Sequence, residues 1–249
     1  MECQKGRGVG ITRRDFIKVT GAIVIVAGTG GCNSFTTGES PAPSSKPETG
    51  QIPLPAGGIP AADGYLLVDI KKCQGCASCM LACSLIHEGV ESLSLSRIQV
   101  MQNSFESFPD DLTIEQCRQC VDPACVKACP TGALGANARH GNVRMVDPEA
   151  CIGCGACFGA CPYTPSRAFL AADKAYDGVA KSRKCDLCAN ARYHWDDAGG
   201  GPDGKQACVE VCPVGAIEFT KEIPKQEGDG GYQVDLRDGS WGSLGYPTN

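Results

Sequence analysis

Sixteen of the 18 cysteines in this 249-residue chain lie in four groups of four, and their spacing limits what the chain can fold into. The first and third groups are spaced C-x2-C-x2-C-x3-C, the second is spaced C-x2-C-x4-C-x3-C, and 19 residues separate the inner pair of the fourth. In chain order the groups are Cys73, Cys76, Cys79 and Cys83; Cys117, Cys120, Cys125 and Cys129; Cys151, Cys154, Cys157 and Cys161; and Cys185, Cys188, Cys208 and Cys212. With so many cysteines, the fold need not depend on apolar packing alone.

This spacing is typical of loops that hold [4Fe–4S] clusters. A C-x2-C-x2-C loop wraps three thiolates around one cluster with backbone N–H groups facing the sulfurs. In two-cluster ferredoxins the fourth cysteine, followed by proline, ligates the neighbouring cluster, and a proline follows the last cysteine of groups two, three and four. Such motifs work in pairs, so four groups predict two modules and four [4Fe–4S] clusters.

Two other uses of cysteine compete with this interpretation. A disulfide-rich extracellular binding protein would also be rich in cysteine, but disulfide frameworks do not usually repeat C-x2-C-x2-C-x3-C-P. Zinc sites favour two separated C-x2-C pairs, and group four alone has that form. Four similar quartets favour one explanation for all sixteen cysteines, which is iron–sulfur binding.

The remaining composition indicates a binding partner that is a protein. The formal net charge is −5, without a basic stripe or an aromatic platform, which argues against nucleic acid. No nucleophile and base form a recognisable constellation, and no Gly-rich phosphate loop follows a strand. The three histidines (His87, His140 and His194) each stand alone in a polar setting, which favours surface positions. The sequence therefore predicts no catalytic residue.

The N-terminal residues 1–31 have the pattern of a twin-arginine export signal. Residues 12–18 (TRRDFIK) carry the paired arginines, and the apolar run from Val19 to Gly31 is too short to cross a bilayer as a helix. The alternative is an amphipathic N-terminus with two chance arginines. A twin-arginine signal predicts export of the folded protein, with its clusters already built, to the periplasm or the outer face of the cytoplasmic membrane. Cys32 ends the run and is either a lipid attachment site or unmodified, because the lipobox before it is incomplete.

Composition divides the rest of the chain into three parts. Residues 32–63 are rich in Pro, Gly and Ser and predict a linker. The cysteine groups lie in residues 64–224, where "YLLVDI" (65–70) and "NVRMVD" (142–147) predict strands before groups one and three. Residues 225–249 form a Gly-rich tail, either a loosely packed surface segment or an arm around a partner. No apolar segment follows the core, so the sequence predicts no C-terminal membrane helix.

Residues 64–224 resemble the four-cluster, ferredoxin-like electron-transfer (β) subunits of molybdenum and tungsten oxidoreductases, such as dimethyl sulfoxide reductase, polysulfide reductase and formate dehydrogenase. The resemblance rests on "CQGCASCMLAC", "CRQCVDPACVKACPTGAL", "CIGCGACFGACPY" and "KCDLC…ACVEVCPVGAI". It implies an α+β fold of two pseudo-symmetric dicluster modules, rich in loops, in which groups one and four pair and groups two and three pair.

The resemblance also implies which cysteines share a cluster. One cluster would take Cys73, Cys76, Cys79 and Cys212, a second Cys185, Cys188, Cys208 and Cys83, a third Cys117, Cys120, Cys125 and Cys161, and a fourth Cys151, Cys154, Cys157 and Cys129. None of the sixteen is replaced, so no [3Fe–4S] variant is expected.

The implied function is a non-catalytic electron relay between a large subunit with a molybdenum or tungsten pterin cofactor and a membrane quinone-reactive subunit or a cytochrome. A free-standing polyferredoxin shuttle is an alternative. Residues 83–100 are also similar to small subunits of tungsten aldehyde oxidoreductases, which gives a third.

Two further features bear on the clusters and their partners. Four cationic residues lie beside cluster cysteines and either raise cluster potentials or are solvated; they are Arg118, Lys127, Arg183 and Lys184. The 19-residue insert in group four (189–207) predicts a docking loop, because loops on a rigid scaffold often carry contacts.

Overall fold

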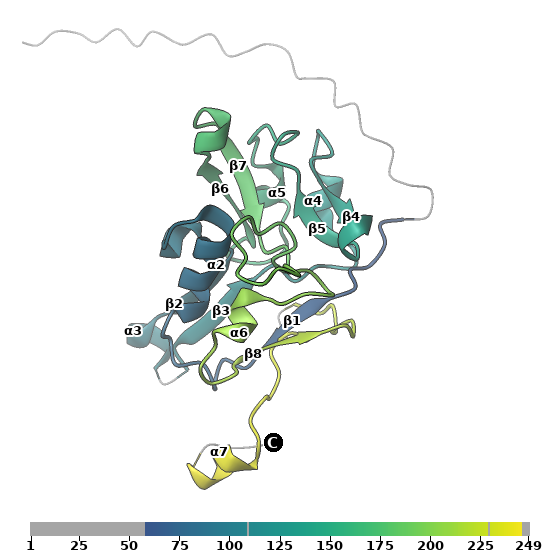
Figure 1. Ribbon diagram of the computed structural model, residues 1–249. Coiled ribbons are helices and arrows are strands. Elements are labelled where there is room, and N and C mark those ends of the chain that lie inside the picture. Colours follow the sequence, from purple (N-terminus) through teal and green to yellow (C-terminus); the bar gives the residue numbers. More distant parts are fainter. Residues whose placement is uncertain (1–57, 109, 229, 246–249) are drawn as a thin grey trace, which may run out of the picture. The chain divides into compact units, whose positions relative to one another are not determined.

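A computed structural model describes residues 58–245 except 109 and 229. These described residues belong to one compact unit (Figure 1). The predicted export signal, Cys32 and the linker up to residue 57 lie outside the described residues.

A unit of strand, cysteine loop, helix and strand occurs four times along the chain. The strands that lead into the four cysteine groups are β1 (Tyr65–Val68), β3 (Leu112–Gln116), β5 (Val143–Val146) and β7 (Ala180–Lys184). The helices within or beside the groups are α2 (Ser78–Glu88), α4 (Ala124–Lys127), α5 (Ala156–Gly159) and α6 (Ala207–Glu210). The strands that follow are β2 (Ile98–Gln102), β4 (Leu134–Asn137), β6 (Ala168–Ala172) and β8 (Ile217–Thr220).

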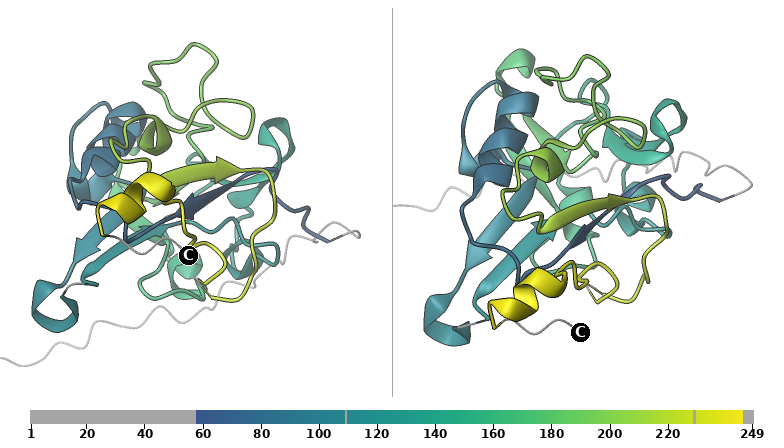
Figure 2. Two further views of the ribbon diagram at one scale, coloured as in Figure 1. Left: turned by 90° about the horizontal axis from the view of Figure 1, so that it is seen from below. Right: turned by 60° about the horizontal axis from the view of Figure 1, so that its bottom comes forward.

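Each leading strand pairs antiparallel with a strand that follows another group. Strand β3 pairs with β2, β5 with β4, and β7 with β6, while β1 pairs with β8 near the other end of the domain. The register of this last pair runs from Tyr65 opposite Thr220 to Val68 opposite Ile217. Figure 2 shows β8 lying beside β1, and α6 also contacts α2. The chain thus returns on itself and brings cysteine groups one and four together.

The predicted fold class is confirmed: short helices and antiparallel strand pairs are joined by long loops. The strands predicted at 65–70 and 142–147 are β1 and β5. Three of the four helices beside the cysteine groups have only four residues. Because isolated helices this short are not stable in water, their conformation depends on the surrounding loops and core. The remaining elements are α3 (Ser104–Ser107), α7 (Gly239–Ser243) and the 3₁₀ turns Leu93–Leu95, Ala138–His140 and Lys174–Tyr176.

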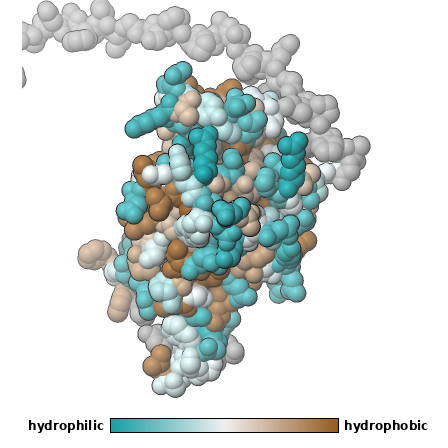
Figure 3. Space-filling model, viewed as in Figure 1, coloured by the Kyte–Doolittle hydropathy of each residue, from teal (hydrophilic) through white to brown (hydrophobic). Residues whose placement is uncertain are grey.

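The main core is made of small aliphatic side chains and cysteines. Its buried aliphatic members are Leu66, Val68, Ile98, Ile114, Val143, Leu187 and Ile217, and six cysteines pack among them. On the face drawn in Figure 3, hydrophobic side chains are scattered among hydrophilic ones. Because cysteines pack among the aliphatic side chains, the apolar core lies directly against the cysteine loops and excludes water from the side of each loop that it touches.

The prediction of a loosely packed tail at residues 225–249 is partly wrong, because Tyr232 is fully buried. Its side chain packs against Ala62 and Tyr65, and its hydroxyl donates a hydrogen bond of 2.7 Å to the backbone oxygen of Arg118. The backbone of Val234 also donates to the oxygen of Val68 at 2.9 Å. This first part of the tail therefore covers the outer edge of β1.

Among the residues that the structure describes, we find no helix with both the length and the apolar character needed to span a bilayer.

Candidate iron–sulfur cluster sites

The fold brings the sixteen cysteines together in four sets. Three cavities are each lined by four cysteines: Cys73, Cys76, Cys79 and Cys212 (site 1), Cys185, Cys188, Cys208 and Cys83 (site 2), and Cys151, Cys154, Cys157 and Cys129 (site 4). In the remaining set, Cys117, Cys120 and Cys161 lie close enough to Cys125 to raise the pKa of its thiol (site 3). Each set takes three cysteines from one group and the fourth from the partner group, as the resemblance implies.

The four loops share one backbone geometry around the first three cysteines. The residue two positions after the first cysteine has a positive φ in every group: Gly75 (67°), Gln119 (49°), Gly153 (71°) and Leu187 (55°). In two groups its N–H donates to the first cysteine, from Gly75 to Cys73 Sγ at 3.4 Å and from Gln119 to Cys117 Sγ at 3.5 Å. The third cysteine is then the second residue of α2, α4, α5 or α6. The four similar cysteine groups in the sequence therefore fold into four similar loops.

A Cβ atom at Gly153 would lie 2.2 Å from the backbone oxygen of Ala180 in β7. The group-three loop therefore packs directly against the strand that leads into group four.

Each fourth cysteine accepts a backbone hydrogen bond at its sulfur. The donors are the N–H groups of Arg97 to Cys83 (3.3 Å), Leu134 to Cys129 (3.4 Å), Arg167 to Cys161 (3.3 Å) and Ala216 to Cys212 (3.2 Å). Sequence reasoning missed these donors, because a backbone N–H has no residue type that would reveal it. Hydrogen bonds to sulfur are one of the means by which proteins adjust cluster potentials.

Burial makes most of these thiols hard to ionise on their own. Desolvation, with the charges of neighbouring cysteines, raises the pKa of both Cys79 and Cys125 to about 12. Burial likewise raises the pKa of Cys185, Cys188 and Cys208 at site 2. Metal ligands must be deprotonated, so these buried thiols would ionise only on binding a strongly cationic group.

The donor sets fit [4Fe–4S] clusters. All sixteen cysteines are free thiols, and the sets of sites 1, 2 and 4 each line one cavity. Among residues 58–245 apart from the two omitted positions, no three His, Cys, Asp or Glu side chains are arranged to hold a single metal ion. Four thiolates around one cavity are the ligands that a cubane needs.

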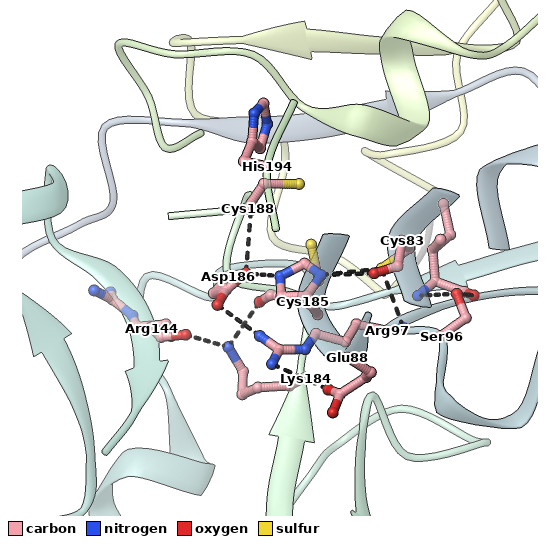
Figure 4. A network of polar contacts seen from close by, with 12 residues as sticks. Cys83, Glu88, Ser96, Arg97, Arg144, Lys184, Cys185, Asp186, Cys188 and His194 are labelled. Atoms are coloured by element: carbon pink, nitrogen blue, oxygen red, sulfur yellow. Dashed lines mark hydrogen bonds and ion pairs between the residues drawn. The ribbon is translucent and has the colours of Figure 1, made fainter. Parts of the chain in front are cut away.

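Site 2 adjoins a buried polar network centred on Asp186 (Figure 4). The Asp186 carboxylate accepts hydrogen bonds from Arg97 at 2.6 Å and from the backbone N–H of Cys188 at 3.1 Å, and it lies 3.0 Å from His87 Nε2. Burial alone would lower the pKa of His87, but the charge of Asp186 raises it to about 9. At Cys83, burial opposes ionisation, yet the hydrogen bond and charge of His87 lower the thiol pKa.

The surface position predicted for His87 is wrong, because only 5% of this residue is exposed. Its second ring nitrogen, Nδ1, lies 2.8 Å from the backbone oxygen of Cys83. The other two histidines are half-buried, and His194 Nε2 lies 3.0 Å from the backbone oxygen of Lys205.

Three of the four cations beside cluster cysteines are buried, so the solvated alternative is wrong for them. Arg118 is 1% exposed and lies over the Tyr232 ring, and Arg183 pairs with Glu88 and Asp173. Lys184 is 3% exposed. The side chain of Lys127, in contrast, is 45% exposed and pairs with Asp122, so the solvated alternative fits this residue.

The insert at 189–207 is anchored through its backbone, at Tyr193 to the oxygen of Ile86 (2.8 Å) and at Gly201, but it carries exposed aromatic side chains. The backbone N–H of Gly201 donates to the oxygen of Leu187 at 2.7 Å, while Tyr193 and Trp195 are 58% and 48% exposed. Its role as a docking loop stays a prediction.

The geometry defines the chain as a protein of the ferredoxin class, with cysteine loops that are shared between paired motifs. Comparison with known sequences agrees, since residues 110–222 match the 4Fe-4S dicluster domain. The chain is 40% identical over 148 residues to the aliphatic sulfonate oxidoreductase polyferredoxin-like subunit of Pyrococcus furiosus, covering 59% of this chain and 70% of that protein. It is 36% identical over 159 residues to the thiosulfate reductase electron transfer subunit of Salmonella typhi, covering 62% of this chain and 73% of that protein.

A third relative, the NADH-dependent phenylglyoxylate dehydrogenase subunit beta of Aromatoleum evansii, is 36% identical over 165 residues. That alignment covers 65% of this chain but only 31% of the relative. The chain belongs to the family of [4Fe–4S] iron–sulfur subunits of oxidoreductases, as the resemblance in its cysteine motifs predicted. With this family and sixteen free thiols, the disulfide-framework alternative is wrong.

Proposed function

We propose that this chain is the non-catalytic electron-transfer subunit of an oxidoreductase complex and holds four [4Fe–4S] clusters, one in each of sites 1 to 4. Its partner on one side is a large catalytic subunit with a molybdenum or tungsten pterin cofactor. On the other side it meets a membrane quinone-reactive subunit or a cytochrome. When bound, each cluster takes up and releases one electron at a time.

The observation that carries the proposal is the serial order of the four sites. Cys208 of site 2 lies near Cys79 of site 1, Cys185 of site 2 lies near Cys117 of site 3, and all four pack in the main core. Sites 3 and 4 meet where Cys125 packs with Cys129 and Cys157. The sites therefore follow one another in the order 1, 2, 3, 4.

The exposed cysteines lie at the two ends of this series. Cys76 at site 1 and Cys154 at site 4 are exposed, whereas every cysteine of site 2 is buried. A relay needs just this arrangement, in which the terminal sites approach partners and an inner site is shielded from water. The protein's own residues hold and shield the sites, and the sixteen cysteines serve as ligands rather than nucleophiles.

The location that we propose is the periplasm or the outer face of the cytoplasmic membrane. Its support is the twin-arginine pattern at residues 12–18, which belongs to a route for folded proteins. Clusters built in the cytoplasm would then occupy the thiolates before they meet oxidising conditions. The exported protein would stay at the membrane in one of two ways, through a lipid on Cys32 or through the partner subunit alone.

A second candidate function is a free-standing shuttle, and the 40% identity to a polyferredoxin-like subunit favours keeping it. An electron-transfer subunit of a tungsten aldehyde oxidoreductase remains the third. These candidate functions differ in whether a large catalytic subunit co-purifies with the chain, and in which metal that subunit contains.

The test is anaerobic purification of the full chain with a C-terminal affinity tag from fractionated cells. We expect the chain in the periplasmic or membrane fraction, together with a large subunit that contains molybdenum or tungsten. A paired Arg13→Lys, Arg14→Lys variant is the control and should stay in the cytoplasm. Purification of the iron-loaded wild-type chain alone would contradict the complex and favour the shuttle, and wild-type protein confined to the cytoplasm would contradict export.

A further inference from the structure

Lys184, the last residue of β7, is a buried cation between two of the cysteine sites. Its ammonium donates to the backbone oxygen of Arg144 at 2.5 Å and to that of Cys185 at 3.2 Å. Figure 4 shows the side chain reaching from β7 toward Arg144 and lying against Cys185. The same Cys185 oxygen also accepts a hydrogen bond of 2.9 Å from the side-chain amide of Gln119, which lies between Cys117 and Cys120 in the group-two loop. Lys184 therefore lies where the group-four loop of site 2 meets the group-two loop of site 3.

The charge of this ammonium is not balanced by a carboxylate. Within the described residues Lys184 forms no ion pair with Asp or Glu, although the side chain is inaccessible to water. The acid whose pKa it helps to lower, Asp186, already binds Arg97 and lies against His87. An unpaired buried charge is strongly destabilising, so we expect negative charge near the ammonium from another source.

Bound clusters at sites 2 and 3 would bring that negative charge, because their cysteine ligands must be thiolates. Cys185 of site 2 and Cys117 of site 3 pack in the same core cluster. Lys184, next to Cys185 in the chain, thus lies at the junction of the two sites.

We propose that the Lys184 ammonium is a fixed positive charge shared by sites 2 and 3, and that it raises the reduction potentials of both clusters together. Reduction adds one negative charge to a cluster, and a nearby cation stabilises the reduced state. Burial strengthens this effect, because little water lies between the ammonium and the thiolates. Lys184 acts on the clusters through its charge and is not a ligand of their iron. This inference rests on the proposed function.

The test is the Lys184→Met variant in the iron-loaded full chain, with midpoint potentials measured by anaerobic redox titration followed by EPR. Methionine keeps the length of the side chain and removes its charge. We expect two of the four midpoint potentials to shift to more negative values and the other two to stay in place. Unshifted potentials with all iron retained, or an equal shift of all four, would overturn the inference.

Two lysine variants serve as matched controls. Lys127→Met removes an exposed charge near site 3 and should leave all four potentials unchanged, because solvent screens it. Lys181→Met removes a buried cation whose ammonium donates to the Cys151 oxygen at 2.6 Å, at site 4. A shift of the same two potentials by Lys181→Met would show that any buried charge acts on them, and would overturn the specific role of Lys184.

Folding defects are separated from charge effects by Lys184→Arg. If Lys184→Met loses iron, the arginine variant should retain it, because its charge is preserved. Loss of iron from both variants would make Lys184 a packing residue and overturn the proposal. A wild-type chain without iron would overturn the proposed function and this inference together, whereas iron-loaded protein with unmoved potentials overturns the inference alone.

Discussion

The Cys208→Ala variant is expected to lose about four of about sixteen iron atoms per chain, the content of one cubane. Cys208 is 5% exposed, is the second residue of α6, and packs in the main core with Cys79 of site 1 and with Cys83 and Cys185 of site 2. Alanine removes the thiolate with little change in backbone preference. Iron, acid-labile sulfide and the EPR signals of the dithionite-reduced protein measure the result.

The same variant tests the serial order of the sites. If electrons pass from site 1 to site 3 through site 2, loss of the site 2 cluster should slow turnover of the purified complex by orders of magnitude. The control is Ser84→Ala, which removes a fully buried hydroxyl next to Cys83 and should keep all the iron. Full iron content in Cys208→Ala would show that Cys208 is not a ligand, and normal turnover without the site 2 cluster would contradict the relay.

The Asp186→Asn variant should lower the stability of the holoprotein by about 3–5 kcal/mol, because it leaves buried cations without their counter-charge. The native carboxylate is 3% exposed, accepts a hydrogen bond from Arg97 and lies against His87. For a domain of this size such a loss corresponds to a fall of about 6–20 °C in the thermal midpoint. Circular dichroism under anaerobic conditions at one scan rate measures it.

An exposed ion pair provides the matched control for this prediction. Asp203 pairs with Lys221 at 2.8 Å, with 90% and 61% of their side chains exposed. Asp203→Asn should therefore cost less than about 1 kcal/mol. Equal thermal midpoints for the two variants would mean that the Asp186 network does not stabilise the fold.

Local spacing predicted the parts of the structure that are encoded over a few residues. The spacing within the four cysteine groups predicted the four loops, and the apolar runs predicted β1 and β5. The fourth member of each cysteine set lies far along the chain. The sequence alone predicted that motifs pair, and the family resemblance was needed to say which groups come together.

The features that sequence reasoning missed depend on contacts between distant residues. His87 was predicted at the surface because no second histidine stands near it in the sequence, but its acidic partner Asp186 lies 99 residues away. Tyr232 looked like part of a surface tail, and the backbone oxygen that it binds lies 114 residues away. Lys184 stood beside Cys185 in the sequence, whereas its hydrogen bond to the backbone oxygen of Arg144 joins residues 40 positions apart. Charge near a cysteine is visible in a sequence, but its burial is not.

The central claim is that each of the four cysteine sets holds one [4Fe–4S] cluster, and a single measurement tests it. Iron and acid-labile sulfide are counted in the full chain after anaerobic purification. Four cubanes predict about sixteen of each per chain. Fewer than about four iron atoms per chain, less than one complete cluster, would contradict the account.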